Sequence, residues 1–240
     1  MRTSANSISV NDQSEPLNRP VWQALNGRQS SFAIGDGRAL RFVPDVSLFA
    51  AARDDSSECI AALGALVAAG GNVLLLQAEE SPLPPGTAIE LTAPCVQMVL
   101  DRLVPIGASA RIAPLGEADA PEMLELATLT QPGPFFARTH ELGAFWGVKE
   151  NGKLIAMAGE RMRLDGFTEI SGVCTNPDYR GRGLAATLSH TVASHILARG
   201  ETPFLHAYAG NAAAIAIYQA LGFVLRRQMV ATVLRRAELN

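Results

Sequence analysis

The sequence predicts an α+β protein, of the α/β type in a broader classification. A mixed central sheet flanked by helices is expected in the C-terminal half, preceded by a smaller N-terminal α/β domain. The chain has 240 residues, 48% of them hydrophobic, which is enough for the cores of one large or two small domains. Segments with the period of a strand are interleaved with segments whose apolar residues recur about every 3.6 positions, as in helices. Clusters of glycine, asparagine and proline separate them.

The first half begins with a predicted hairpin around Asp36-Gly37, a dipeptide that favours tight turns. A helix capped by Ser56 or Ser57 is expected next. Gly70-Gly71-Asn72 separates it from an apolar segment that is typical of a buried strand. The elements expected here, a strand pair, a helix and two further strands, cover residues 32–34, 39–42, 57–69, 72–77 and 95–101.

Composition excludes several classes of function. Residues 60–78 carry no charge, but the helix and the strand within them are each too short to cross a bilayer, so we expect no membrane association. A net charge of -3 and a pI near 5.8 argue against nucleic-acid binding. Cys59, Cys95 and Cys174 are widely spaced, which suggests no disulfide framework and no metal site. Residues 1–20 are polar and lack the core of a signal peptide, so we expect a flexible tail and a cytoplasmic protein.

After a linker near residues 105–110, the second half alternates strands and helices. Asn151-Gly152 is a hairpin turn, since both positions tolerate positive φ. The expected strands cover residues 110–113, 144–149, 153–164, 167–175, 202–208 and 223–235, the last segment forming a closing pair. Helices are expected near residues 119–130 and 134–141, from Leu184 to about Gly200, and from Asn211 to Gly222.

The most informative segment lies between the strand ending at Thr175 and the helix starting at Leu184. Gly181 and Gly183 let the backbone approach a ligand closely, and the free amides and dipole of the helix favour an anion there. This turn therefore predicts a cradle for phosphate, with Arg180 and Arg182 at its rim. A second stripe, formed by Asn211, Ala214 and Tyr218, shares one face of the later helix.

Two other phosphate motifs are excluded. Gly181 to Ala186 also fits the dinucleotide fingerprint, but too little chain follows for a doubly wound sheet. No Gly-Lys-Ser/Thr follows the turn, so it is not a Walker loop.

Together the two motifs resemble the GCN5-related N-acetyltransferase (GNAT) superfamily, and within it the FR47-like members. The resemblance rests on Arg180-x-x-Gly183-x-Ala185 and on Asn211-x-x-Ala214-x-x-x-Tyr218 followed by Leu221-Gly222-Phe223, and it covers about residues 110–236. It implies a GNAT fold and a catalytic domain over residues 106–240. Residues 21–105 would then be a degenerate GNAT-like companion or an unrelated small α/β domain, two alternatives that the sequence leaves open.

The resemblance further implies transfer of an acetyl group from acetyl-CoA to a primary amine, without a metal. The residues expected to bind the coenzyme are Val173, Cys174, Thr175, Arg180, Gly181, Arg182, Gly183, Leu184, Ala185, Ala186, Asn211, Ala214 and Tyr218. Tyr218 is the expected acid for the leaving thiolate, at a cost of ~2 kcal/mol from ordinary pKa values near 10 and 8.5.

Two carboxylates on the central strands are candidate bases for the acceptor amine. Glu169 is preferred to Glu160 because it lies on the strand that leads into the cradle. Either could instead form an ion pair with Arg161 or Arg163. His206 is a weaker candidate for contact with substrate.

A non-catalytic acyl-CoA sensor or scaffold is the competing function, although retention of Asn211 and Tyr218 favours the enzyme. The acceptor is a small-molecule amine or a peptide, and the sequence does not distinguish them. The chain could act as a monomer or as a homodimer.

Overall fold

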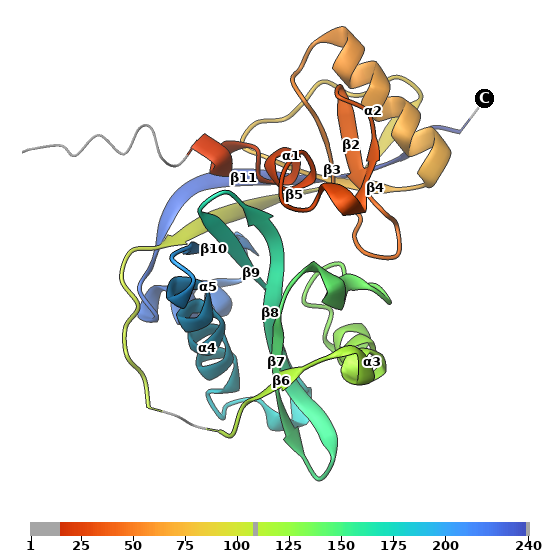
Figure 1. Ribbon diagram of the computed structural model, residues 1–240. Helices are drawn as coiled ribbons and strands as arrows, with labels where there is room; N and C mark the ends of the chain where they lie inside the picture. The colour runs from red at the N-terminus through yellow and green to blue at the C-terminus, as the bar shows by residue number, and fades with distance from the viewer. Residues whose placement is uncertain (1–14, 108–109, 239–240) are drawn as a thin grey trace, which may run out of the picture.

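The computed structural model describes residues 15–107 and 110–238. Its main feature is an eight-stranded mixed sheet with the order β4-β11-β5-β10-β9-β8-β7-β6, and a three-stranded sheet, β1-β2-β3, lies beside it (Figure 1). The strands of the large sheet are β4 (Val73–Gln77), β5 (Thr87–Leu100), β6 (Ala113–Leu115), β7 (Phe145–Glu150), β8 (Lys153–Leu164), β9 (Phe167–Thr175), β10 (Thr202–Tyr208) and β11 (Phe223–Arg236).

The predicted N-terminal hairpin is confirmed, since β1 (Ala33–Gly35) and β2 (Ala39–Phe42) pair antiparallel. β2 also pairs with β3 (Ala50–Ala52), a short strand that the sequence analysis missed. The helices are α1 (Pro20–Leu25), α2 (Ser57–Gly70), α3 (Ala120–Thr130), α4 (Leu184–Ala198) and α5 (Ala212–Ala220).

The large sheet continues across the predicted domain boundary at residue 105. β5 lies between β11 and β10, and β4 pairs with the other side of β11. Strands from both halves of the sequence therefore share one sheet, as Figure 1 shows where β5 runs along β11. The division into residues 21–105 and 106–240 stays a prediction.

Three expectations need correction. The tail expected over residues 1–20 includes a 3-10 helix at Glu15–Asn18, in which Leu17 is fully buried, while residues 1–14 lie outside the described part. No α-helix forms over residues 134–141, and the structure has only a 3-10 helix at Thr139–Leu142. The Arg138 amide, which would donate to the Pro134 carbonyl in such a helix, donates instead to the Asp45 carbonyl at 3.0 Å. The closing pair of strands is the single long strand β11.

Helices cover both faces of the C-terminal part of the sheet. α4 and α5 pack on one face, against a cluster that includes Ile155, Ile170 and Leu205. α3 packs on the other face, against Phe145 and Met157 (Figure 1). Within the described part of the chain, none of the helices has both the length and the apolar character to cross a membrane.

Candidate active site

The site begins where two neighbouring parallel strands separate. β10 pairs with β9 from Thr202 and Phe167 as far as Leu205 and Ile170. Beyond that point β9 pairs only with β8, and β10 continues along β5. The sheet therefore opens between the carboxyl ends of β9 and β10, and a cavity of about 760 Å³ fills the opening.

The predicted anion cradle lies at one end of this cavity. Gly181 and Gly183 have φ of 77° and 71°, values that residues other than glycine rarely adopt. The first bond of α4 runs from the Thr187 amide to the Gly183 carbonyl at 3.1 Å, so the preceding amides of the first turn have no acceptor within the helix. These amides and the helix dipole make a site for a phosphate group.

The two arginines of the cradle differ in their surroundings. Arg182 donates to Glu150 at 2.8 Å, and its guanidinium lies 5.5 Å from the centre of the Tyr179 ring. The Arg180 side chain is exposed at the mouth of the cavity. Both can add positive charge beside a bound anion. Exposed arginines contribute little to the free energy of binding, however, because dissolved salt screens their charge.

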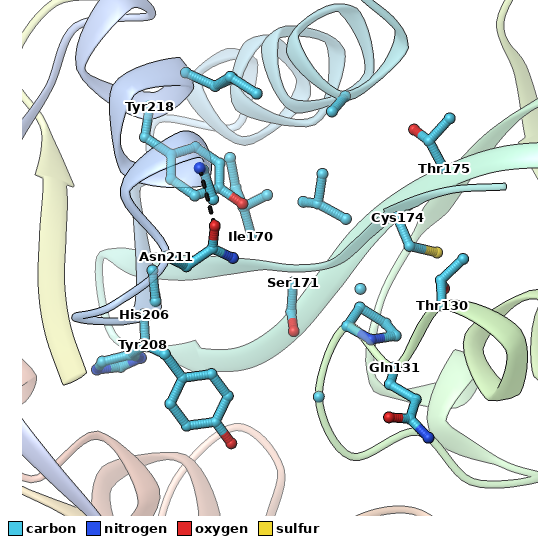
Figure 2. A pocket seen from close by; sticks show the side chains of 18 of the residues that line it. Thr130, Gln131, Ile170, Ser171, Cys174, Thr175, His206, Tyr208, Asn211 and Tyr218 are labelled. Atoms are coloured by element: carbon cyan, nitrogen blue, oxygen red, sulfur yellow. Dashed lines mark hydrogen bonds between the residues drawn. The ribbon is translucent and has the colours of Figure 1, made fainter. Parts of the chain in front are cut away.

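The end of β9 forms one wall of the cavity, which is lined by Val173, Cys174 and Thr175. Figure 2 shows the last two of these side chains. The Thr175 hydroxyl is buried and has no hydrogen-bond partner. Burial raises the pKa of the Cys174 thiol to about 11, so this side chain is neutral at pH 7. The wall thus offers an unused hydroxyl and a neutral thiol to a ligand.

Asn211 and Tyr218 belong to the same helix, α5, as N-cap and as a buried residue near its end, and both line the cavity. Asn211 caps α5, its side-chain oxygen accepting a hydrogen bond from the Ala214 amide at 3.2 Å (Figure 2). Tyr218 is 9% exposed, and its ring lies edge-on to Phe223. Burial raises the pKa of the Tyr218 phenol to about 12, so this group is protonated across the physiological pH range.

Glu169, the preferred base, is fully buried and does not line the cavity. Its carboxylate accepts two hydrogen bonds from Arg161, at 2.6 and 2.8 Å, and lies 2.7 Å from Nδ1 of His206. Burial alone would raise the pKa of this carboxyl, but Arg161, followed by His206, outweighs burial and lowers it to about 2. Glu169 is therefore a weak base. The structure shows the ion pair with Arg161 that the sequence analysis gave as its alternative role.

His206 does line the cavity, and the surrounding network fixes its tautomer. Gln97 presents its amide nitrogen to Nε2 of His206 at 3.0 Å. That orientation of Gln97 is set by Arg226, which donates to its oxygen, and by the Leu17 carbonyl, which accepts from its nitrogen. Nε2 of His206 is thus the acceptor, and Nδ1 carries the proton toward Glu169.

Glu160, the second candidate base, also lies away from the cavity. It is 1% exposed and pairs with Arg199 at 2.9 Å, next to Gly143. A Cβ at position 143 would lie 2.5 Å from that of Glu160, so a glycine is required there for the chain to pack over this carboxylate.

The sequence analysis missed the part of the cavity that lies on the side of the N-terminal elements. Phe49, Leu74, Leu76, Cys95 and Ala231 line it together with Arg161. Only the buried character of residues 72–77 was apparent, because sequence pattern does not show that β4 and β5 join the same sheet as β9 and β10. The segment Thr130 to Pro134 and the residues Ser171 and Tyr208 also line the cavity (Figure 2).

Comparisons with known proteins agree with this geometry. The family model described as FR47-like protein matches residues 145–231. The chain is similar to the [Ribosomal protein bS18]-alanine N-acetyltransferase of Escherichia coli K12, with 39% identity over 75 residues, which are 31% of this chain and 50% of that protein. It therefore spans about half the length of the curated relatives it matches.

Solved structures extend the similarity over almost the whole chain. A GNAT-family protein from Novosphingobium aromaticivorans has a TM-score of 0.87 and 45% identity, covering 93% of this chain and 100% of its own. A GCN5-related N-acetyltransferase from Kribbella flavida, at 19% identity, shares the fold with a TM-score of 0.63 over 92% of this chain and 94% of its own. With the cradle, the separated strands and Tyr218 in place, the chain belongs to the GNAT superfamily of acetyltransferases.

Proposed function

We propose that this protein is an N-acetyltransferase that transfers an acetyl group from acetyl-CoA to a primary amine. The observation that carries the proposal is the continuous cavity, which runs from the anion cradle at α4, along the end of β9, to the buried Tyr218. A donor with a charged end and a long polar arm fits this shape.

The residues present fit coenzyme A. The cradle amides would bind its pyrophosphate, and the φ of 77° with open space beside Gly181 allows close approach. The unpaired Thr175 hydroxyl and the backbone of β9 would meet the pantetheine arm. Asn211 would act by capping α5 and so orienting Tyr218.

In the transfer, the amine nitrogen forms a bond to the acetyl carbon and the carbon–sulfur bond breaks. One proton leaves the nitrogen and one reaches the sulfur. With the pKa of Tyr218 at about 12 and that of a thiol near 8.5, full proton transfer costs ~5 kcal/mol. This exceeds the ~2 kcal/mol expected from ordinary values, yet it is small beside a typical barrier of ~16 kcal/mol. We therefore keep Tyr218 as the proposed proton donor.

Removal of the amine proton is the less direct step. Neither Glu169 nor Glu160 lines the cavity, so either would act on the acceptor only through water. We propose that Glu169 is instead a positioning residue, which holds Arg161 and His206 at the cavity wall.

The test is release of free thiol from acetyl-CoA across a panel of amines: arylamines, alkylamines, amino acids, polyamines and peptides with free N-termini. The peptide arm is included because the Escherichia coli relative is named for an alanine of a ribosomal protein. We expect acceptor-dependent release with at least one class. Tight binding of acetyl-CoA without release in any arm would instead indicate a sensor.

A further inference from the structure

The cavity extends across the sheet into an apolar chamber that the donor does not need. We define the acceptor chamber as the part lined by Phe49, Leu74, Leu76, Cys95 and Ala231. These five residues belong to one buried cluster, whereas Tyr218, Ile170 and Leu184 belong to the cluster under α4 and α5. The gap between β9 and β10 therefore connects the cradle side of the sheet with a chamber on the side of the N-terminal elements.

The chamber is lined by buried apolar side chains, most of them on paired strands. Leu76 of β4 lies opposite Ala231 of β11 in the sheet, and Cys95 of β5 lies opposite the buried Met229. Phe49 forms a bridge to β4, and the Arg161 guanidinium lies 4.7 Å from the centre of its ring. An apolar body, above all a flat ring, would be desolvated on entry and packed against these side chains.

No described carboxylate lines the cavity. Its ionisable lining groups are Arg161, Arg180, Arg182, His206, Cys95, Cys174, Tyr179, Tyr208 and Tyr218. Burial raises the pKa of Cys95 and Cys174 to about 11 and that of Tyr218 to about 12, so these three are neutral at pH 7. Glu169 lies behind Arg161 and is fully occupied by it and by His206. A cation in the chamber would thus lose its hydration without gaining an anion.

Among the residues that the structure describes, none gives the chamber a free proton acceptor. Nε2 of His206 accepts from Gln97, so it would have to give up that hydrogen bond to take a proton from substrate. An aliphatic amine with a pKa near 10.4 is neutral in only about one molecule in 10³ at pH 7. An amine of low basicity arrives neutral, so no base is needed before it attacks, and the one proton that its nitrogen then loses can pass to the departing thiolate or to water.

We propose that the acceptor is a weakly basic apolar amine of the arylamine class, which enters the acceptor chamber as the free base. Its ring lies against Phe49, Leu74 and Leu76, and its nitrogen points through the gap between β9 and β10 toward the thioester. This inference rests on the proposed acetyl transfer and names the acceptor of that same cavity.

Two isomeric acceptors test the proposal: 4-methylaniline and benzylamine have the same atoms but differ greatly in basicity. We expect kcat/KM at pH 7 to favour 4-methylaniline by at least about 100-fold and to be flat between pH 6.5 and 8.5. For benzylamine, kcat/KM should rise about tenfold per pH unit, following the neutral fraction. 1,5-Diaminopentane should be a poor acceptor at every pH.

A matched pair of variants tests the charge argument. Cys95→Asp places a carboxylate in the chamber near Arg161, and Cys95→Asn is the uncharged control. The Asp variant should raise kcat/KM for benzylamine relative to 4-methylaniline by about tenfold or more, and the Asn variant should leave the ratio near that of the wild type. Circular dichroism checks folding, and the wild-type comparison decides the question if Cys95→Asp does not fold.

Calorimetry separates this inference from the proposed function. Binding of 4-methylaniline, but not of diaminopentane, to the protein with coenzyme A supports the chamber even if no transfer follows. Preference for benzylamine, diaminopentane or a peptide by a protein that binds acetyl-CoA overturns the acceptor class alone. Failure to bind acetyl-CoA overturns the proposed function and this inference with it.

Discussion

The substitution Glu169→Gln tests the buried ion-pair network beside the cavity. Glu169 is fully buried and holds Arg161, whose side chain is only 12% exposed. The glutamine keeps the shape but leaves Arg161 as a buried charge without its counter-ion, a change that typically costs about 3–5 kcal/mol. In a chain of this length such a loss lowers Tm by roughly 6–20 °C.

The pKa of Glu169 gives a second, independent value for the contribution of this ion pair to the free energy of unfolding. Its fall from 4.5 to about 2 on folding corresponds to ~3 kcal/mol of stability. Because the folded pKa is the lower one, this stabilisation is complete above about pH 4.5 and is lost as the pH falls from 4.5 toward 2. The variant should therefore differ most from the wild type at pH 7, and the difference should shrink below pH 4.

Urea unfolding at a series of pH values measures both quantities. The control is Asp45→Asn, which breaks an ion pair with Arg138 at 3.1 Å between side chains that are 48% and 43% exposed. This control should cost less than about 1 kcal/mol. A Glu169→Gln variant within about 1 kcal/mol of the wild type at pH 7, or a difference that does not depend on pH, would refute the reasoning.

Two further substitutions test the donor end of the cavity. Thr175→Val replaces a buried hydroxyl that has no partner, so stability should hold or rise slightly while Kd for acetyl-CoA increases about two- to tenfold, measured by calorimetry; an unchanged Kd would remove this hydroxyl from the coenzyme site. Tyr218→Phe should lower kcat by about 10²–10³ with a change of less than about threefold in Kd for acetyl-CoA, because a general acid acts in the transition state. Retention of full kcat would show that the ring only packs, and Gln219→Ala serves as the control, because Gln219 is an exposed residue of α5 that does not line the cavity.

The donor side of the site was predictable from the sequence because its determinants are local. Gly181 and Gly183 show the turn, Asn211 shows the cap of α5, and the spacing to Tyr218 keeps them on one face. Each of these signals depends on residues a few positions apart, and the structure confirms the turn and the cap.

The acceptor side was not predictable because it depends on pairing between distant strands. Nothing local in residues 87–100 indicates that β5 inserts between β11 and β10. For the same reason the ion pair of Glu169 with Arg161 was predicted only as an alternative, and nothing indicated that His206 would also contact the carboxylate. The missing helix at residues 134–141 has the same kind of cause, since the Arg138 amide donates to the Asp45 carbonyl, which is distant in sequence, and not to the Pro134 carbonyl.

Binding of acetyl-CoA to Gly183→Asp tests the central claim, that the turn before α4 is the anion site for the coenzyme, most directly. An aspartate there adds bulk and negative charge where the pyrophosphate would lie. Gly166→Asp is the matched control, because Gly166 has a similar φ of 76° with open space around it and does not line the cavity. Calorimetry should show that the wild type and Gly166→Asp bind acetyl-CoA with similar affinity. For Gly183→Asp, Kd should be at least about 100-fold higher, or no binding should be detected. Equal affinity of all three proteins would contradict the account.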